Sequence, residues 1–314
     1  MTVSIIIPMY NCENYIDECI ISCIHQGKIV KEIIIVDDHS TDTSAAKALK
    51  YMSSYPDLVS YFLNDKKGAC SARNYGYKMS TGNYIQFLDA DDILGEDKIE
   101  EQLKNIETKP NSIANCGWIK FKSNIKDGSY RAQNIDKSYD KPIEWLIDSW
   151  NGNGVGAIHS WLIPRNLIEK AGGWNESLLK NQDGEFLARV IANSTSIQFN
   201  PRVFTYYRAP SETNVSSNIS EAAITSLLNS YKLYEIILTK NQSTEVVKAI
   251  SRNYLDFIYK YYNLYPNLAK KAIEYVHQLS TPIIIPFQNE FVKFLNSIIG
   301  YQVIFKTRKL IKGY

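Results

Sequence analysis

Short apolar runs alternate with amphipathic stretches through the first ninety residues of the chain. Val3–Met9 and Ile33–Val36 are rich in β-branched residues, which is typical of parallel strands buried on both faces. Leu58–Leu63 and Tyr84–Leu88 predict two further strands. Apolar residues at helical spacing predict helices over about residues 16–24, 43–51 and 69–79. This order of elements predicts an open α/β sheet with right-handed crossovers.

Polar residues and a glycine mark the expected ends of these helices. Asn11 is the expected N-cap of the first helix, and Ser40-Thr41-Asp42 precedes the second as a capping cluster. Gly82 is expected to end the third helix as a C-terminal cap. We therefore expect the polar residues to mark the starts of the first two helices and Gly82 to mark the end of the third.

The pattern changes twice after residue 110. In the middle of the chain it predicts strands at Ile113–Lys122 and Ile158–Ile163, a helix at Asp183–Ile191 and an extended segment at Ser196–Arg208. From about residue 220, apolar residues recur at helical spacing. We therefore expect an α/β domain over residues 1–217 and a helical region over residues 218–314.

Composition narrows the class of protein. The 314 residues are 45% hydrophobic and 22% charged, so the chain can bury a core. Its 35 Lys and Arg against 33 Asp and Glu give a net charge of +2, which argues against a nucleic-acid partner. No apolar run of about 18 residues and no signal pattern at the N-terminus are present, so we expect a cytoplasmic protein.

The five cysteines are odd in number and include no CxxC pair. Cys19 and Cys23 share one face of a predicted helix, but no matching His or Cys pair completes a metal site. We therefore expect small buried thiols in a reducing compartment.

Polar residues follow three of the predicted strands, where open α/β sheets bind their ligands. These are Pro8-Met9-Tyr10-Asn11, Asp37-Asp38 and Asp89-Ala90-Asp91-Asp92. The last cluster suits Mg²⁺ or Mn²⁺ bound to substrate phosphates, or else it is a solvated turn that caps a helix. Asp38 would accept hydrogen bonds from a base or a ribose, unless it too only forms a turn.

Two further positions carry candidate chemistry. Arg73, at a predicted helix start, would reach a phosphate or a base edge, or else form a surface ion pair. Asp183 and Glu185 lie in the first turn of a predicted helix, where a carboxylate can serve as general base. The helix dipole alone also favours acidic residues there.

Together these segments resemble the inverting family 2 glycosyltransferases, which have the GT-A fold. The matching segments are Ser4–Asn11, Ile35–Asp42, Gly68–Asn74, Gly82–Asp92, and Gly172–Leu178 followed by Gln182–Glu185. They lie in the family's order and spacing and cover about residues 3–210. The helical remainder carries no family motif.

The resemblance implies transfer of a sugar from a nucleotide-diphosphate donor, most commonly a UDP-sugar, to an acceptor hydroxyl. It assigns Pro8, Tyr10 and Asp38 to the base and ribose site, Arg73 to the base or diphosphate, Asp89 to the ribose, Asp91 to Mn²⁺ or Mg²⁺, and Asp183 to the catalytic base. The physical logic agrees, because inversion needs a base on the acceptor side and stabilisation of charge on the leaving diphosphate.

The sequence also departs from the family pattern. Gln182-Asp183 replaces the frequent Glu-Asp pair, which leaves Glu185 as a second candidate base. No histidine follows the final strand, so water or Glu212 would complete the metal's coordination, and His159 is interpreted as structural or pocket-lining rather than as a metal ligand. Trp161 and Trp174 would stack on an acceptor sugar or belong to the core.

Residues 291–314 contain five Lys or Arg among apolar residues and no acidic residue. This pattern is typical of an amphipathic helix on an anionic membrane, or of a final core helix with a basic end. We expect an enzyme of surface polysaccharide, lipopolysaccharide or glycan synthesis, on a glycan or lipid-linked acceptor, cytoplasmic or at the inner face of the plasma membrane. The alternatives are an inactive nucleotide-sugar-binding or assembly protein, and a nucleotidyltransferase. A nucleotidyltransferase would need a basic phosphate-binding loop after the first strand, and Pro8–Asn11 is a poor match to such a loop.

Overall fold

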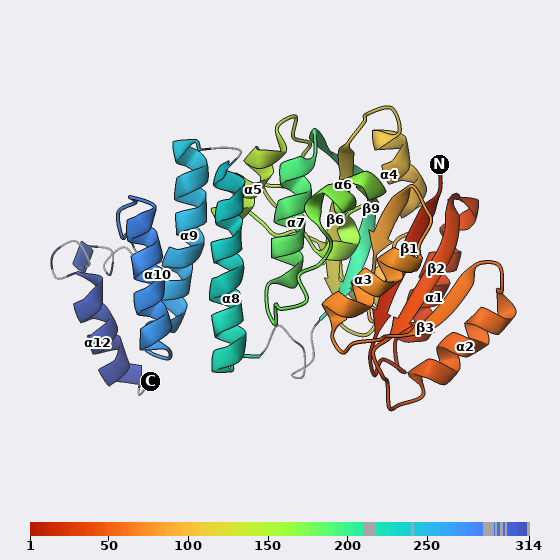
Figure 1. Ribbon diagram of the computed structural model, residues 1–314, viewed down its shortest axis with the longest axis horizontal. Helices are drawn as coiled ribbons and strands as arrows, with labels where there is room; N and C mark the ends of the chain where they lie inside the picture. Colours follow the sequence, from red (N-terminus) through yellow and green to blue (C-terminus); the bar gives the residue numbers. More distant parts are fainter. Residues whose placement is uncertain are drawn as a thin grey trace. The chain divides into compact units, whose positions relative to one another are not determined.

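A five-stranded sheet with the strand order β3-β2-β1-β4-β8 carries the N-terminal part of the chain (Figure 1). Its strands are β1 (Val3–Met9), β2 (Val30–Asp37), β3 (Val59–Leu63), β4 (Tyr84–Phe87) and β8 (Ile163–Pro164). The first four are parallel and β8 is antiparallel to β4. The four predicted strands are confirmed, and their parallel pairing places the candidate site residues that follow them at one edge of the sheet.

The described part of the computed structural model comprises residues 1–209, 218–239, 242–284 and 300–312, together with residues 292, 294, 295 and 298. Its helices are α1 (Ile16–Ile24), α2 (Ser44–Ser54), α3 (Ala69–Met79), α4 (Lys98–Ile106), α5 (Pro142–Trp150), α6 (Arg165–Ala171), α7 (Gln182–Asn193), α8 (Glu221–Tyr234), α9 (Thr244–Tyr261), α10 (Pro266–Gln278) and α12 (Tyr301–Lys312).

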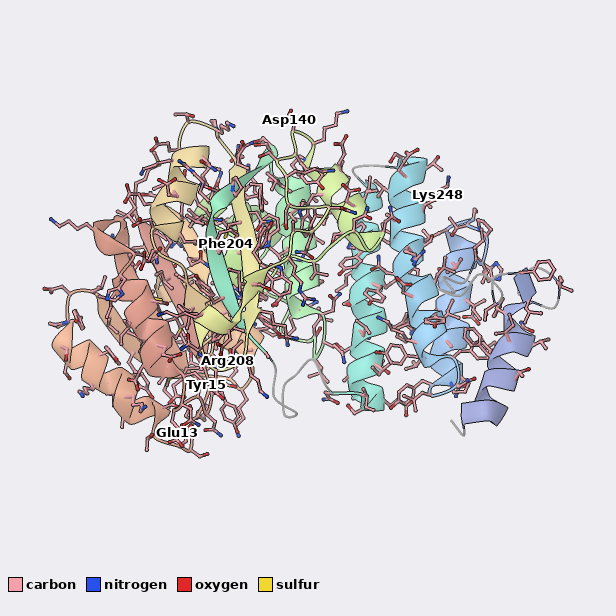
Figure 2. The ribbon with its side chains drawn as sticks, turned by 180° about the vertical axis from the view of Figure 1, so that it is seen from behind. Glu13, Tyr15, Asp140, Phe204, Arg208 and Lys248 are labelled. Carbon is pink, nitrogen blue, oxygen red and sulfur yellow. The ribbon has the colours of Figure 1, made fainter. Side chains whose placement is uncertain are left out.

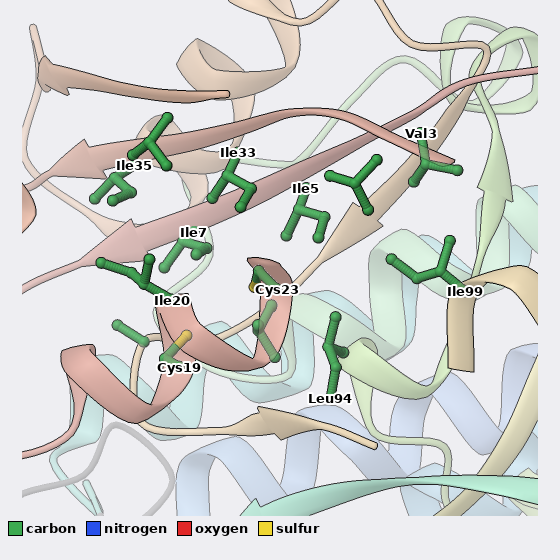
Figure 3. Packing of buried hydrophobic residues seen from close by; sticks show 14 of the residues in the cluster. Val3, Ile5, Ile7, Cys19, Ile20, Cys23, Ile33, Ile35, Leu94 and Ile99 are labelled. Atoms are coloured by element: carbon green, nitrogen blue, oxygen red, sulfur yellow. The ribbon is translucent and has the colours of Figure 1, made fainter. Parts of the chain in front are cut away.

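Register between the central strands builds the core. Ile5 lies opposite Ile33 and Ile7 opposite Ile35, and all four side chains are fully buried. They pack against Cys19, Ile20 and Cys23 of α1, with Leu94 and Ile99 closing the same cluster (Figure 3). Burial of each isoleucine contributes roughly 1.5–3 kcal/mol. All five cysteines are free and buried, as expected from their number and spacing.

Helix α3 covers the other face of the sheet at close range. A Cβ at Gly76 would lie 2.5 Å from Cγ2 of Ile6 and 3.2 Å from Cγ2 of Val36. A larger residue would push α3 away from β1 and β2, so this glycine sets how near Arg73, one turn earlier on the same helix, comes to the strand ends.

A second sheet has the order β5-β9-β6-β7. Its strands are β5 (Ile93–Leu94), β6 (Ser112–Phe121), β7 (Ser129–Tyr130) and β9 (Ser196–Arg208). β6 and β9 run parallel, with a shift in register between Cys116 and Gly117. The mixed sheets and the helices that follow are the GT-A fold expected above.

The predicted strand at Ile158–Ile163 is wrong. Residues Ile158–Ser160 form a turn of 3₁₀-helix, and the chain becomes extended only from Trp161, with a bridge from Leu162 to Ala114 and the short strand Ile163–Pro164. Two buried side chains from elsewhere hold the turn, because Nε2 of Gln86 donates to the carbonyl of His159 and Nε2 of Gln102 donates to that of Ser160.

Two predicted helix signals also have other roles. Asn11, at φ 45°, accepts the amide of Thr41 through Oδ1 at 2.8 Å, whereas α1 begins only after Tyr15. Helix α3 ends at Ser80, and Gly82 is needed for a close approach, since a Cβ there would lie 2.6 Å from the amide nitrogen of Ser4. Asn11 thus joins two loops, and Gly82 joins the chain to β1.

The chain divides into two units. The larger comprises Met1–Trp145, Asn153–Ser177 and Gln182–Asn214, and the smaller comprises Leu146–Gly152, Leu178–Asn181 and Val215–Tyr314. In the smaller unit α8, α9 and α10 pack in sequence order (Figure 1). Phe305 of α12 is buried and stacks on Tyr262 with ring centroids 4.6 Å apart. No described helix combines the length and apolar character needed to cross a bilayer.

Candidate active site

Arg73 lies at the centre of the candidate site. It is on the second turn of α3, with a side chain only 6% exposed, and its Nη2 is 2.6 Å from Oδ1 of Asp89, just beyond β4. The same Nη2 is 4.0 Å from Oδ1 of Asp183, in the first turn of α7. One buried cation thus brings together carboxylates that are 94 positions apart in the sequence.

Trp174 supports this guanidinium from one side. The carbon at the centre of the Arg73 guanidinium lies 4.5 Å from the indole centroid, within cation–π range. The indole stacks on Phe186 at 4.2 Å and 13°. Nε and Nη1 of Arg73 are buried without a hydrogen-bond partner among the described residues, so two donors remain for a ligand.

Asn74 fixes the loop that carries Trp174. Its Oδ1 accepts the amide of Trp174 at 2.8 Å, while its Nδ2 donates to the carbonyl of Trp174 and to Oε1 of Glu176, both at 2.9 Å. Neighbouring residues of α3 therefore have paired roles, because Asn74 positions the tryptophan on which Arg73 rests.

Asp183 has the properties of a base. Its side chain is 43% exposed, so a substrate can reach it. Loss of hydration raises its pKa to about 6, Arg73 opposes this shift, and the negative charge of Asp89 adds to it. Glu185, the second candidate, is 3% exposed, and both of its oxygens accept from Arg189 at 2.7 Å. The geometry therefore favours Asp183.

The acidic loop after β4 is held by Asp92 rather than by its other carboxylates. Asp92 is 1% exposed; its Oδ1 accepts the amide of Arg208 at 2.8 Å and its Oδ2 lies 2.9 Å from Nδ1 of His159. The carboxylate raises the pKa of His159, which burial alone would lower. His159 therefore has the structural role favoured by the sequence.

Arg208, the last residue of β9, completes this anchor. Its Nε donates to the carbonyl of Asp91 at 2.8 Å and its Nη2 lies 2.7 Å from Oε2 of Glu18. The guanidinium also lies 4.4 Å from the rings of Tyr15 and Phe121. Figure 2 shows Arg208 and Tyr15 close to each other. Sequence reasoning missed this residue, because nothing near it in the chain indicates its partners.

Asp91 is the carboxylate of the loop left for a ligand. It is half-buried, and burial together with the charges of Asp92 and Asp89 raises its pKa to about 7. No described Lys, Arg or His lies within ion-pair distance of it. The described residues contain no cluster of three or more metal ligands. One carboxylate plus substrate phosphates is a common donor set for Mg²⁺, so these residues fit a metal bound together with a diphosphate.

Tyr207 lies beside the acidic loop, against His159. Burial raises the pKa of its hydroxyl to about 12, and the charges of Asp92, Asp89, Asp91 and Asp183 all contribute. Its ring stacks on that of His159 at 5.9 Å and 14°. Tyr207 falls within the segment predicted to be extended, Ser196–Arg208, and no motif assigns it a role.

The residues assigned to the base and ribose site lie at the ends of β1 and β2. Pro8 is half-buried, and Tyr10 is 60% exposed. Both oxygens of Asp38 accept the amide of Gly68, at 3.0 and 2.9 Å, and Oδ1 also accepts from Nδ2 of Asn64. Asp38 therefore joins the end of β2 to the start of α3.

Neither tryptophan considered for an acceptor sugar is available to one. Trp161 is fully buried and packs edge-on against Trp145 at 5.1 Å. Trp174 is 4% exposed, with its ring between Phe186 and Arg73. Both belong to the core, which is the second of the two interpretations above. Glu212, proposed to complete the metal site, lies outside the described residues.

Comparison with known proteins gives the family. Residues 4–170, more than half of the chain, match the model of glycosyl transferase family 2. An uncharacterized glycosyltransferase of Rickettsia typhi, RT0329, is 32% identical over 245 residues, which is 75% of this chain and 70% of that protein. GgaB, a minor teichoic acid biosynthesis protein of Bacillus subtilis, is 40% identical over 112 residues, 35% of this chain and only 12% of GgaB.

A solved structure agrees on the fold. Residues 1–349 of TarS from S. aureus superpose with a TM-score of 0.62 at 17% identity, covering 91% of this chain and 81% of that one. This similarity concerns the fold, whereas the family rests on the sequence matches. This chain is a member of glycosyl transferase family 2.

Proposed function

We propose that this glycosyltransferase moves a hexosyl group from a nucleoside diphosphate donor to an acceptor hydroxyl, with inversion at the anomeric carbon. The observation that carries the proposal is the convergence of Asp89 and Asp183 on the buried guanidinium of Arg73. A UDP-sugar is the preferred donor, because TarS, which has the same fold, was crystallised with UDP and with UDP-GlcNAc.

The donor would bind at the ends of the parallel strands. Tyr10 is exposed and has no side-chain hydrogen bond among the described residues, so its ring is free to stack on a base. Pro8 lies on β1 and Asp38 directly follows β2. Asp89 would accept from the ribose with the oxygen that Arg73 leaves free.

Asp183 would act as the general base. The acceptor oxygen attacks the anomeric carbon as the bond from that carbon to the diphosphate oxygen breaks. The acceptor proton passes to the carboxylate of Asp183, and the nucleoside diphosphate leaves with the bonding electrons. A single in-line displacement inverts the configuration, and a base with a pKa near the working pH is well suited to it.

Arg73 and Asp91 would act on the leaving group. The unpartnered Nε and Nη1 of Arg73 can donate to diphosphate oxygens as charge develops there. Asp91 would hold Mn²⁺ or Mg²⁺ together with those oxygens. When bound, such an ion neutralises negative charge on the leaving diphosphate.

The setting we propose is synthesis of a surface polymer on a glycan or lipid-linked acceptor. The matched part of GgaB, a teichoic acid biosynthesis protein, supports it. The expected membrane contact through 291–314 lies partly outside the described residues. Within the described part, Phe305 faces the helical unit, whereas Phe294, Ile298 and Val303 are 60%, 62% and 47% exposed. Those exposed residues, with the basic composition of the tail, support contact with an anionic membrane surface.

Donor hydrolysis in the presence of Mn²⁺ tests the proposal. The wild type should release UDP from at least one member of a panel of UDP-sugars, and Asp183→Asn should release it at least a hundredfold more slowly while still binding UDP. Asp57→Asn, a change at an exposed turn, is the matched control and should behave as wild type. Binding of a UDP-sugar without any turnover by the wild type would instead indicate an inactive binding or assembly protein.

A further inference from the structure

Three partly exposed residues, Trp118, Tyr207 and Val155, lie together apart from the residues assigned to the nucleotide. Trp118 lies on β6 and Tyr207 on β9, and the parallel register places them on one face of the second sheet, because Trp118 lies opposite Thr205, two positions before Tyr207. Their rings meet edge to face with centroids 5.7 Å apart at 78°. Both side chains are half-buried.

Trp118 differs from every other tryptophan of this chain. The remaining four, Trp145, Trp150, Trp161 and Trp174, are 8% exposed or less. Trp118 is half-buried, and Tyr207 is its only aromatic neighbour among the described residues. Part of the indole is therefore open to a ligand.

Val155 adds an apolar wall that is fixed in place. Gln133 holds both backbone groups of Val155, accepting its amide at 2.9 Å and donating to its carbonyl at 3.0 Å. Nε1 of Trp118 donates to the same carbonyl at 3.0 Å. Three hydrogen bonds thus immobilise a residue whose isopropyl side chain is 60% exposed. Such rigid support of an exposed apolar group is readily explained if that group contacts a ligand.

Tyr207 links this surface to the reaction centre. Its ring stacks on that of His159, whose Nδ1 lies 2.9 Å from Oδ2 of Asp92 in the acidic loop. The donor residues Pro8, Tyr10 and Asp38 belong to the other sheet, at the ends of β1 and β2. A molecule resting on Trp118 and Tyr207 would therefore contact the second sheet, whereas the nucleotide would contact the first.

We propose that Trp118, Tyr207 and Val155 form the acceptor subsite and that its occupant is a pyranoside, whose apolar C–H face packs on the two rings and against the valine. Aromatic rings supply this kind of contact at little cost in side-chain entropy. The proposal rests on the proposed function, because an acceptor exists only if the protein transfers sugar.

Intrinsic fluorescence gives a direct test, because Trp118 is the tryptophan open to solvent. The protein with UDP and Mn²⁺ is titrated with the methyl α- and β-pyranosides of glucose, galactose, mannose, GlcNAc and GalNAc. At least one should change the emission saturably, and Trp118→Phe should remove that change.

Val155→Glu should weaken the same pyranoside at least tenfold. In transfer assays it should raise the KM for the pyranoside at least tenfold and leave the KM for the donor within twofold. Ile284→Glu, at an aliphatic residue 65% exposed in the smaller unit, is the matched control and should bind as wild type. Both altered positions are exposed, so neither change disturbs the core.

The outcomes separate the two proposals. If the wild type turns over a UDP-sugar and no pyranoside binds, or if Val155→Glu binds as tightly as Ile284→Glu, the subsite is refuted and the transferase activity stands. If pyranosides bind but no nucleotide sugar is bound or turned over, the proposed function fails and the acceptor role fails with it.

Discussion

Replacing the proposed base should make the protein inactive and more stable. Asp183 has a pKa of about 6 in the folded chain, against about 3.9 for an aspartate in an unfolded chain. A carboxyl group that binds its proton more tightly when folded destabilises the fold once it is ionised. The penalty is fully present above pH 6, decreases as pH falls through 6, and is absent below the unfolded pKa.

The size of this penalty follows from the difference in pKa and from exposure. A difference of two units corresponds to ~3 kcal/mol at most. The side chain is 43% exposed, so solvent screening reduces this to ~1 kcal/mol. Asp183→Asn removes the charge and keeps the shape, while Arg73 keeps its pair with Asp89. The variant should therefore unfold with a free energy ~1 kcal/mol above wild type at pH 8.

Urea denaturation of both proteins at pH 8 and pH 4.5 measures the difference. Most of it should disappear at pH 4.5, where the wild-type carboxyl is protonated in the folded chain. A variant that is less stable than wild type at pH 8, or that differs from it equally at both pH values, would refute the reasoning. The Asp57→Asn control should show no such dependence on pH.

Four further outcomes test other parts of the site. Asn74→Ala removes three hydrogen bonds to the loop of Trp174 and should lower the free energy of unfolding by ~2–3 kcal/mol. It should also weaken UDP binding. A urea midpoint equal to that of wild type would contradict this prediction. Gly82→Ala places a Cβ 2.6 Å from the backbone nitrogen of Ser4 and should lower the thermal midpoint by about 4–8 °C. An unchanged midpoint would show that the backbone moves to accommodate the methyl group. For the wild type, kcat/KM should fall tenfold per pH unit below about pH 6, because Asp183 must be ionised to accept the proton; an acid limb near pH 4 would assign it to another group. EDTA should weaken UDP binding by the wild type and leave Asp91→Asn unaffected, whereas a variant that still responds to added Mn²⁺ would exclude Asp91 as a ligand.

The strands and helices predicted correctly are those in which the element's own residues carry the pattern of apolar positions. Val3–Met9 is a continuous β-branched run, and the helix at Ile16–Ile24 has an apolar face at regular spacing. Ile158–Ile163 has the same apolar character as a strand, but its first half, Ile158–Ser160, forms a 3₁₀ turn, because Gln86 and Gln102 bind the carbonyls of this turn from far along the chain. A local pattern contains no record of such partners.

The candidate site divides in the same way. Asp89, Asp91, Asp183 and Arg73 belong to short motifs and could be selected from the sequence. Arg208 could not, since it binds the acidic loop from 117 positions further along the chain and lies in no motif. His159 is interpreted from the sequence as structural or pocket-lining, but its partner Asp92 could not be predicted. The carboxylates at the strand end could be identified from the sequence. The cations that hold the acidic loop could be identified only from the structure.

The hydrogen bonds and ion pair of Asp92 and the hydrogen bonds of Asp38 limit which residues can be substituted without disturbing the structure. Replacing Asp92 would release the end of β9 and His159 together, and replacing Asp38 would release Gly68 and Asn64. Tyr10 and Val155 have exposed side chains that support nothing else among the described residues. If Tyr10 and Val155 have the proposed roles, substitutions there would change what the enzyme binds at little cost in stability, whereas substitutions at Asp92 or Asp38 would also weaken the fold.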